Sequence, residues 1–337
     1  MAPRAGAALV TGATGLVGSH VAERLIADGW NVRGLVRTND GAATVRELGV
    51  EPILGDVLNA DAVGRAAKGC DVIFHAAAAI TPRGGWESFR RLNIDGTRNT
   101  IAASERSGAR LLHVSSVAVY GPRGRYAHGG NTHEDVIFGP LPPRAHYARS
   151  KRESEDLVLA AHRAGRIWAT AVRPSVIYGR RDRQFVPRIA RLLNRGLVPL
   201  IGGGRTIFAV VEATNVADGA ILAATHDAAG GRAYNLTNDF DVSVRDFFRL
   251  AASGLDKELR FIPVPRALAV AAVRVAKTAA RVVGGGALSV VSSVSVDFLT
   301  RDDPFTSDRA RYELGWSPRV HPDDGVPAAF RWWREHH

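Results

Sequence analysis

The sequence predicts an α/β protein in which a doubly wound parallel sheet is followed by a smaller α+β domain. Short apolar runs alternate with helix-length segments between Ala7 and Val172, as they do in parallel β-α-β units. The runs are rich in Val, Ile and Leu with little polar alternation, which is expected when helices cover both faces of a sheet. Three glycines also fall where the first run meets the first helical segment.

The elements follow in a regular order. The predicted strands are residues 7–12, 31–37, 51–56, 70–78, 109–116 and 167–174. The predicted helices between them are residues 16–28, 60–68, 86–107 and 145–164. Beyond Gly179, an arginine-rich helical segment, a turn at Gly202–Gly204, a short strand and a helix indicate a second domain. We therefore assign residues 1–178 to the first domain, with a return at about 206–237, and residues 179–337 mainly to the second.

Composition narrows the function classes. A formal charge of +11 suggests an anionic partner such as nucleic acid. Only four of the basic residues are lysines and the arginines are scattered among many acids, so a solvated basic surface is the better interpretation. We find no zinc-finger spacing or RNA-binding signature, and we expect neither nucleic acid nor a metal as a ligand. Cys70 is the single cysteine and the first residues lack a secretory apolar run, so we expect a cytoplasmic protein.

The segment 264–283 is apolar but carries four basic residues, which rules out an uninterrupted membrane span. These residues are Arg266, Arg274, Lys277 and Arg281, and they fall near one helical face. We favour a surface helix that covers the substrate pocket. Peripheral contact with a membrane is the alternative, because a basic amphipathic helix can lie on a lipid surface.

The glycine-rich segment predicts a Rossmann-type dinucleotide site. Gly12 would allow a tight turn, Gly15 a close approach of the backbone to a pyrophosphate, and Gly18 close packing of helix on strand. The start of the helix would offer unpaired N–H groups to the anion. The predicted binding residues here are Gly12, Thr14, Gly15, Leu16, Val17 and Gly18.

The ends of the next strands bear on the choice of cofactor. The second strand ends in Arg37 and no carboxylate follows until Asp40, which favours the extra phosphate of NADP(H), although NAD(H) is also possible. Asp56, followed by Val57, is placed to reach the adenine amino group, while small side chains after the fourth strand would leave room for the cofactor. These small residues are Ala76, Ala77 and Ala78; the preceding His75 is interpreted as a packed histidine.

Tyr147 and Lys151 are the candidate chemical centre. A spacing of four on a helix places both side chains on one face, where an ammonium would stabilise a tyrosinate and lower a phenol pKa that is ordinarily near 10. Such a tyrosine can exchange a proton with an alcohol or carbonyl. Ser116 supports this interpretation because it follows the fifth strand, and the carboxyl ends of parallel strands line the ligand crevice.

Together these residues resemble the extended short-chain dehydrogenases/reductases, within the NAD-dependent epimerase/dehydratase superfamily. The resemblance covers nearly the whole chain and implies that Ser116 bonds the reacting oxygen, with Ser115 as the alternative serine. It implies that Tyr147 acts as acid and base, and that Lys151 tunes Tyr147 and binds the nicotinamide ribose. The matching segments are residues 11–18, 55–57, 75–78, 93–97, 115–116, 147–151 and 173–174, with a weaker similarity at 314–318.

Further roles follow from the same resemblance. Asn93 would hold a helix distortion or a water near Lys151. Pro174 and Val176 would lie beside the cofactor. Helices such as those predicted at residues 86–107 and 145–164 commonly form a homodimer in this family, and we expect one here.

Two departures narrow the choice within the family. Val176 stands where sugar-nucleotide members generally carry Asn, and residues 117–119 replace the acidic pair that dehydratases need for elimination of water. Residues 173–179 and 305–315 are similar to the 3β-hydroxysteroid dehydrogenase branch, which includes sterol-4-carboxylate dehydrogenases and bacterial long-chain 3-ketoacid reductases. Plant-type dihydroflavonol reductases share several of these features.

The sequence thus predicts an NADP(H)-dependent oxidoreductase that interconverts a secondary alcohol and a ketone on a bulky apolar substrate. One alternative is a nucleotide-sugar epimerase with tightly bound NAD, in which the arginines between residues 180 and 188 would clasp a diphosphate. A second is a non-catalytic NADP(H)-sensing regulatory protein. The presence of Ser116, Tyr147 and Lys151 argues against a sensor, which needs no proton-transfer group.

Overall fold

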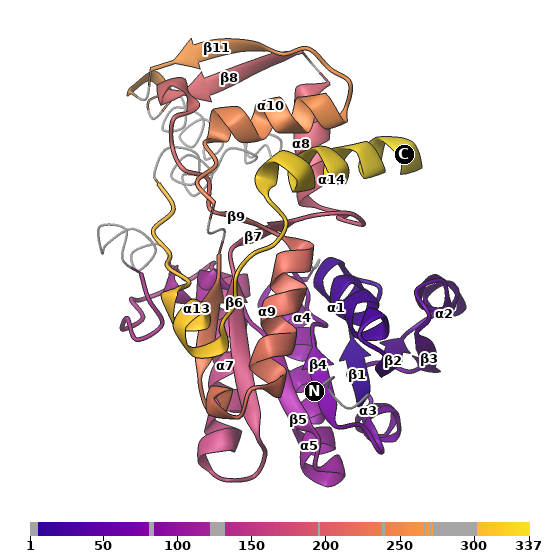
Figure 1. Ribbon diagram of the computed structural model, residues 1–337. Helices are drawn as coiled ribbons and strands as arrows, with labels where there is room; N and C mark the ends of the chain where they lie inside the picture. The colour runs from indigo at the N-terminus through magenta and orange to yellow at the C-terminus, as the bar shows by residue number, and fades with distance from the viewer. Residues whose placement is uncertain are drawn as a thin grey trace. The chain divides into compact units, whose positions relative to one another are not determined.

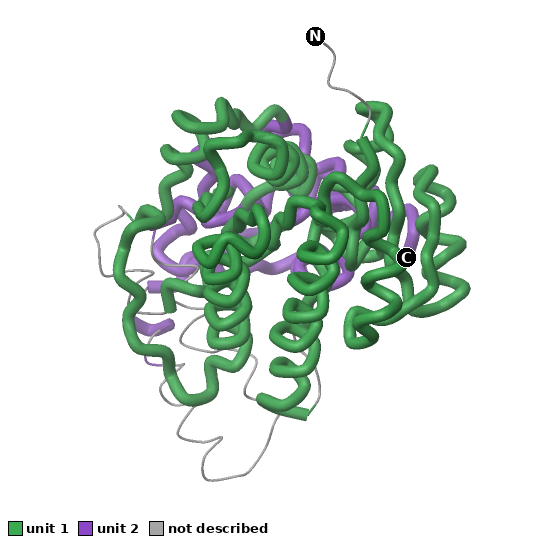
Figure 2. Tube along the Cα trace, turned by 90° about the horizontal axis from the view of Figure 1, so that it is seen from below, with its two compact units in different colours: residues 1–177, 211–239, 305–319 green, residues 178–210, 240–304, 320–337 purple. Residues whose placement is uncertain are grey.

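A computed structural model describes residues 6–80, 84–121, 132–194, 196–237, 240–265, 267–269, 271 and 302–337. The chain divides into two compact units (Figure 2). The first comprises Met1–Ile177, Val211–Asp239 and Phe305–Arg319, and the second comprises Tyr178–Val210, Phe240–Pro304 and Val320–His337. The sequence analysis did not place Phe305–Arg319 with the first unit.

A seven-stranded parallel sheet forms the centre of the first unit (Figure 1). Its strand order is β10-β6-β5-β4-β1-β2-β3, so the chain winds outward in both directions from β1 and β4. The doubly wound α/β fold is thereby confirmed. The strands are β1 (Ala7–Thr11), β2 (Asn31–Val36), β3 (Glu51–Leu54), β4 (Val72–His75), β5 (Arg110–Val114), β6 (Ala169–Pro174) and β10 (Ala233–Leu236).

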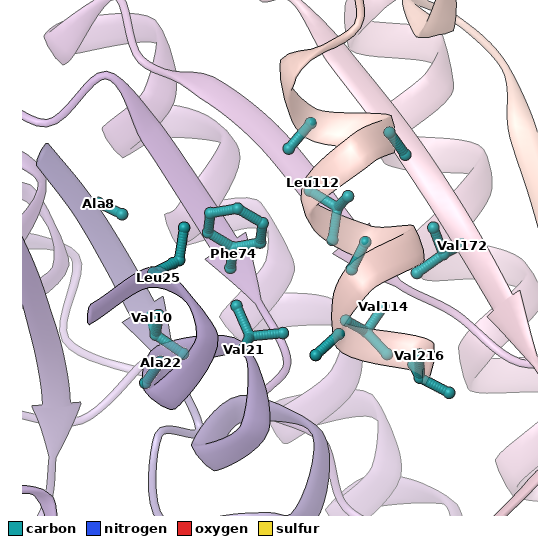
Figure 3. Close-up of a cluster of buried hydrophobic side chains, with 14 of the residues drawn as sticks. Ala8, Val10, Val21, Ala22, Leu25, Phe74, Leu112, Val114, Val172 and Val216 are labelled. Carbon is teal, nitrogen blue, oxygen red and sulfur yellow. The ribbon is translucent and has the colours of Figure 1, made fainter. Parts of the chain in front are cut away.

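Helices cover both faces of this sheet. On one face α1 (Leu16–Ala27), α2 (Asn39–Arg46), α9 (Ala213–Thr225) and α13 (Asp308–Leu314) pack on inward-facing residues, and Figure 3 shows Val21 and Leu25 of α1 in this layer. On the other face α3 (Ala60–Ala67), α5 (Gly96–Ser107) and α7 (His146–Arg163) cover Leu9, Ile73 and Leu111. Because successive strand residues point to opposite faces, each strand contributes to both layers.

Between β2 and β5, two helical segments differ from the predicted ones. The segment predicted as one helix at 86–107 comprises α4 (Gly85–Phe89), the π-helix η1 (Arg90–Asp95) and α5. The short helix α2 was not predicted, although Thr38 caps it by accepting a hydrogen bond from the N–H of Gly41 at 3.1 Å. Only Ala42 and Val45 of its eight residues are buried, so few apolar positions mark the helical period in the sequence.

The second unit is built around aromatic side chains. The rings of Phe208 and Phe247 lie 5.1 Å apart, and Phe185 and Phe330 also pack against Phe247. Its elements are α8 (Phe185–Leu193), β8 (Leu197–Ile201), the 3-10 turn η3 (Gly202–Gly204), α10 (Val244–Gly254), β11 (Arg260–Val264) and α14 (Pro322–His336). β8 and β11 form a parallel pair. A further pair consists of β7 (Val176–Tyr178) and β9 (Val210–Glu212), most of whose residues belong to the first unit.

Most of the segment 264–283, for which a membrane contact was weighed, lies outside the described residues. Within the part that the structure describes, none of the helices combines the length and the apolar character needed to cross a membrane.

Candidate nucleotide and catalytic site

The turn after β1 has the geometry of a cradle for a phosphate. Gly12 has φ +72°, and a Cβ atom there would stand 2.7 Å from the backbone nitrogen of Ala77. A Cβ atom on Gly18 would stand 2.2 Å from the carbonyl oxygen of Gly12, so only glycine lets α1 approach the turn this closely. Gly15 is the N-cap of α1 and supplies no capping side chain, so the first amides of the helix can serve an anion. The residues at this turn therefore fit a dinucleotide pyrophosphate.

Arg37 and Asp56 lie just past two neighbouring strand ends. Arg37 is exposed directly after β2 and immediately before Thr38, the cap of α2. Asp56 follows β3 and is half-buried; one of its carboxylate oxygens accepts a hydrogen bond from the N–H of Leu58 at 2.9 Å. The buried Val57 packs against Gly96, where an added Cβ would approach it within 3.1 Å. The expected adenosine residues therefore lie along the carboxyl edge of adjacent strands.

The loop after β4 closes over the glycine turn. The N–H of Ala76 donates to the carbonyl of Thr11 at 3.2 Å, and that of Ala77 donates to the Thr11 hydroxyl at 3.4 Å. Ala78 is exposed at the same edge. Pro174 ends β6 and Val176 begins β7, so both also lie past a strand's carboxyl end.

Lys151 lies buried at the carboxyl end of β5. Its side chain reaches from α7 to the sheet, where Nζ donates to the carbonyl oxygen of Val114, the last residue of the strand, at 2.7 Å. Burial lowers the pKa of this amine from 10.5 to about 8, while the negative charge of Glu155 opposes the shift. Tyr147 is half-buried one helical turn earlier, with its ring 6.4 Å from that of Phe89.

Ser116 follows β5 by two residues and is half-buried. Its Oγ accepts a hydrogen bond from the N–H of Ala118 at 3.2 Å and caps the 3-10 helix η2 (Val117–Tyr120). Because Oγ is an acceptor in this contact, its O–H can donate elsewhere. The alternative, Ser115, is 2% exposed. The structure thus gives Ser116 the more accessible hydroxyl of the two.

Asn93 lies inside the π-helix η1, so the helix distortion expected at this position is present. Its amide group exchanges two hydrogen bonds with the backbone of Ala79, at 2.7 and 3.0 Å. It also donates to the hydroxyl of Ser150, the neighbour of Lys151, at 2.9 Å. Asn93 therefore ties the loop after β4 to α7 next to the candidate lysine. Single-turn π-bulges are frequent at functional sites.

Sequence analysis missed two buried polar groupings. One joins Thr11, His75, Thr97, His113 and Ser154 beneath the site. Its signal in the sequence is weak: one polar residue at or next to the carboxyl end of each of three strands whose central residues are apolar.

The second missed grouping is an ion pair. The guanidinium of Arg173 bonds the carboxylate of Glu155 at 3.0 and 3.1 Å and the hydroxyl of Tyr120 at 2.9 Å, and both charged side chains are at most 5% exposed. Nearby, a cavity of about 330 Å³ opens beside β10 and contains none of the predicted site residues. Its arginines are paired, Arg173 with Glu155, Arg232 with Glu313 and Arg309 with Asp135. We therefore assign this region to structural support.

In the described part of the chain, His, Cys, Asp and Glu residues nowhere gather in a group that could hold a metal ion. The residues that the structure does bring to one edge of the sheet are the glycine turn, Asp56, the alanines after β4, Ser116 and Lys151. Parallel strands present their carboxyl ends at that edge, which is where ligands bind in open α/β sheets.

Comparisons with known proteins identify the family and the fold. Residues 8–237 match the model of the NAD dependent epimerase/dehydratase family. A relative from Stigmatella aurantiaca, named 4-hydroxy-2-methyl-3-oxo-4-farnesyl-3,4-dihydroquinoline-1-oxide ketoreductase, is 33% identical over 324 residues, which are 95% of this chain and 94% of the relative. Sterol-4-alpha-carboxylate 3-dehydrogenase, decarboxylating, from Bos taurus is 31% identical over 78% of this chain and 74% of its own. The crystal structure of gox2253 superimposes with a TM-score of 0.78 at 27% identity, covering 98% of both chains.

Proposed function

Because the chain belongs to the NAD-dependent epimerase/dehydratase family, within the extended short-chain dehydrogenases/reductases, we propose that it interconverts a secondary alcohol and a ketone on a bulky apolar substrate with NADP(H). The observation that carries this proposal is the position of Lys151. Its buried amine bonds Val114, the last residue of β5, which lies two residues before Ser116 in the chain. Lys151 itself lies one helical turn after Tyr147 on α7.

Three residues of this chain are assigned to proton transfer and to orientation of the substrate oxygen. When bound, the nicotinamide cofactor supplies or accepts the hydride. Tyr147 gives its phenolic proton to a ketone oxygen, or takes the proton of an alcohol in the reverse direction. The positive charge of Lys151 favours the tyrosinate form. Ser116 donates a hydrogen bond to the same substrate oxygen, for which its O–H is available.

The apolar substrate class is supported by the relatives. One is named as a ketoreductase of a farnesylated dihydroquinoline oxide and another as a sterol-4-alpha-carboxylate dehydrogenase. Both names describe a ketone or alcohol on a large, mostly apolar molecule. The departures at Val176 and at residues 117–119 support the same choice over a sugar-nucleotide substrate.

The function is tested by following nicotinamide absorbance with purified protein, either cofactor, and a panel of substrates. The panel contains steroids, long-chain 3-keto and 3-hydroxy compounds, and UDP-sugars. We expect many cofactor turnovers per enzyme with an apolar compound. Interconversion of a UDP-sugar with no net change in cofactor would instead establish the epimerase alternative. Cofactor binding with no conversion of either class would favour a sensor.

Replacing Tyr147 with phenylalanine tests the assigned chemistry. Removal of the proton donor should lower kcat by about 100-fold or more while leaving cofactor binding nearly unchanged. Tyr312→Phe is the matched control, since Tyr312 is 82% exposed on α13. Full activity of Tyr147→Phe would remove this residue from the mechanism.

We propose NADP(H) as the preferred cofactor because Arg37 follows β2 without a nearby carboxylate. Loss of a charge-assisted hydrogen bond costs about 1.5–3 kcal/mol, so Arg37→Ala should weaken NADPH binding about 10-fold to 100-fold and NADH binding little. Arg46→Ala, an exposed arginine at the far end of α2, is the control. Equal losses of affinity for both cofactors would show that Arg37 does not bind the extra phosphate of NADPH.

The homodimer and the membrane contact of residues 264–283 stay predictions. Light scattering by the purified chain would give the oligomeric state, and cosedimentation with anionic vesicles would measure membrane binding.

A further inference from the structure

On the face of the central sheet that α3, α5 and α7 cover, two neighbouring rows of side chains, here called levels, differ in polarity. At one level Leu9, Ile73 and Leu111 face the helices in register across β1, β4 and β5, and all three are fully buried. Two residues further along the same strands, and on the same face, stand Thr11, His75 and His113, each at most 1% exposed. We call these last three residues the polar row. The apolar layer ends at this row, one residue short of the strand end that accepts the Lys151 amine.

His75 belongs to a chain of hydrogen bonds in which each group donates to the next, from Thr11 through His75 and Thr97 to the carbonyl oxygen of Asn93. The hydroxyl of Thr97 donates to the carbonyl oxygen of Asn93 at 2.6 Å, so it accepts from Nε2–H of His75 at 3.0 Å. Nδ1 of His75 is then the acceptor for the Thr11 hydroxyl at 2.8 Å. This proton assignment requires a neutral His75, and burial lowers the pKa of His75 to about 3.

The second histidine makes the corresponding connection to α7. Nε2 of His113 and the hydroxyl of Ser154 lie 3.1 Å apart, and Ser154 donates to the backbone carbonyl of Lys151 at 3.1 Å. The rings of His75 and His113 are 5.5 Å apart, which joins the two branches. Asn93 connects the branch that contains His75 to α7, because its side-chain amide donates to the hydroxyl of Ser150, the residue before Lys151.

We propose that His113 and Ser154 are positioning residues for Lys151, and that the polar row as a whole fixes α7 and η1 to the sheet at the level of the reaction. This inference rests on the proposed role of Lys151. Burying polar side chains at a helix-sheet interface is unfavourable unless they are hydrogen-bonded. The buried side chains here, each with at least one hydrogen bond, are Thr11, His75, Asn93, Thr97, His113 and Ser154. The apolar level directly beside the polar row shows that the same strands can be packed with leucine and isoleucine.

The charged and titratable groups around Lys151 are few. His75 and His113 face it from the sheet, Glu155 lies one turn later on α7, and Tyr147 lies one turn earlier. A lost bond between His113 and Ser154 would loosen α7 from β5 and admit water beside the amine. Hydration favours the charged form of a lysine, so the pKa of Lys151 would rise toward its ordinary value.

The experiment is an NMR titration of the unliganded protein labelled with ¹³C at lysine Cε. The chain has only four lysines, Lys68, Lys151, Lys257 and Lys277, so the Lys151 signal can be assigned by its loss in Lys151→Met. In wild type it should titrate near pH 8. In His113→Leu and in Ser154→Ala we expect its midpoint to rise by about one pH unit. His113→Gln, which keeps a side-chain N–H donor, should restore most of the wild-type value.

Ile73→Val is the matched control for destabilisation alone. It removes one methylene from the apolar level and should leave the Lys151 midpoint unchanged. An unchanged midpoint in both His113→Leu and Ser154→Ala, or an equal rise in Ile73→Val, would overturn the proposal. The titration needs neither cofactor nor substrate, so its result is independent of whether the proposed reaction is found. Where turnover is measurable, His113→Leu should lower kcat about tenfold and His113→Gln should recover it.

Discussion

Replacing Lys151 with methionine should stabilise the first unit while removing turnover. Lys151 is 4% exposed, and its pKa falls from 10.5 to about 8 because burial penalises the charged amine. One pH unit corresponds to about 1.4 kcal/mol, so holding this charge in the folded protein below pH 8 costs about 3 kcal/mol. Methionine has a similar length and no charge, so the variant avoids that cost.

The lost hydrogen bond reduces the gain. Nζ of Lys151 donates to the buried carbonyl oxygen of Val114 at 2.7 Å. Methionine leaves this acceptor without its donor, which costs about 1–2 kcal/mol. At pH 7 the variant should therefore be more stable than wild type by about 1–2 kcal/mol.

The gain is confined to a pH window. The lysine of the unfolded chain keeps its proton up to about pH 10.5, whereas that of the folded chain loses it near pH 8. Since the unfolded state binds more protons between these values, wild-type stability rises across the window and the advantage of the variant disappears.

The assay is urea unfolding of both proteins at pH 7 and pH 10, with the exposed Lys257→Met as control. If Lys151→Met is less stable than wild type at pH 7, or if the difference is the same at both pH values, the burial argument is wrong.

Two further predictions concern packing. Gly18→Ala would bring a Cβ atom to 2.2 Å from the carbonyl oxygen of Gly12 and push α1 off the turn, so kcat/KM should fall about 100-fold and the urea unfolding midpoint should fall as well; normal cofactor affinity would contradict this. Glu155→Gln leaves Arg173 buried opposite a neutral amide and should lower the free energy of unfolding by about 3–5 kcal/mol in urea titrations; a loss below about 1 kcal/mol would show that water or another acceptor compensates.

Local patterns were enough to predict six of the seven strands of the central sheet and the residues at their ends, whereas β10 was expected only as part of the segment returning to the first domain. The apolar runs are short and well separated, and the glycine turn, Ser116 and the Tyr147–Lys151 spacing are each contained within a few residues of sequence. The carboxyl ends of all strands in a parallel sheet lie at the same edge, so residues that follow different strands come near one another. These motifs could therefore be placed together without knowing the details of packing.

The polar row and the Arg173–Glu155 pair depend on contacts between distant segments. Thr11 lies 64 residues before His75, and only the register between β1 and β4 brings them together. Predicting His75 as a packed histidine was right about its burial but gave no information about its partners. The assignment of Phe305–Arg319 to the first unit has the same cause, since Trp316 packs into a core formed some hundred residues earlier and donates to the carbonyl of Asn215 at 2.9 Å.

The polar row supplies the polar but uncharged neighbours that a buried lysine requires. A buried ammonium needs polar neighbours, yet a second positive charge beside it would oppose it. Burial, and after it the positive charge of Lys151, lowers the pKa of both His75 and His113, so the two imidazoles stay neutral where the amine is charged. Neutral imidazoles retain one donor and one acceptor each, which allows the directional bonding that ends at Asn93 and Ser154. Histidine can thus fix two helices at this level without adding charge, whereas leucine there would supply packing and no hydrogen bond.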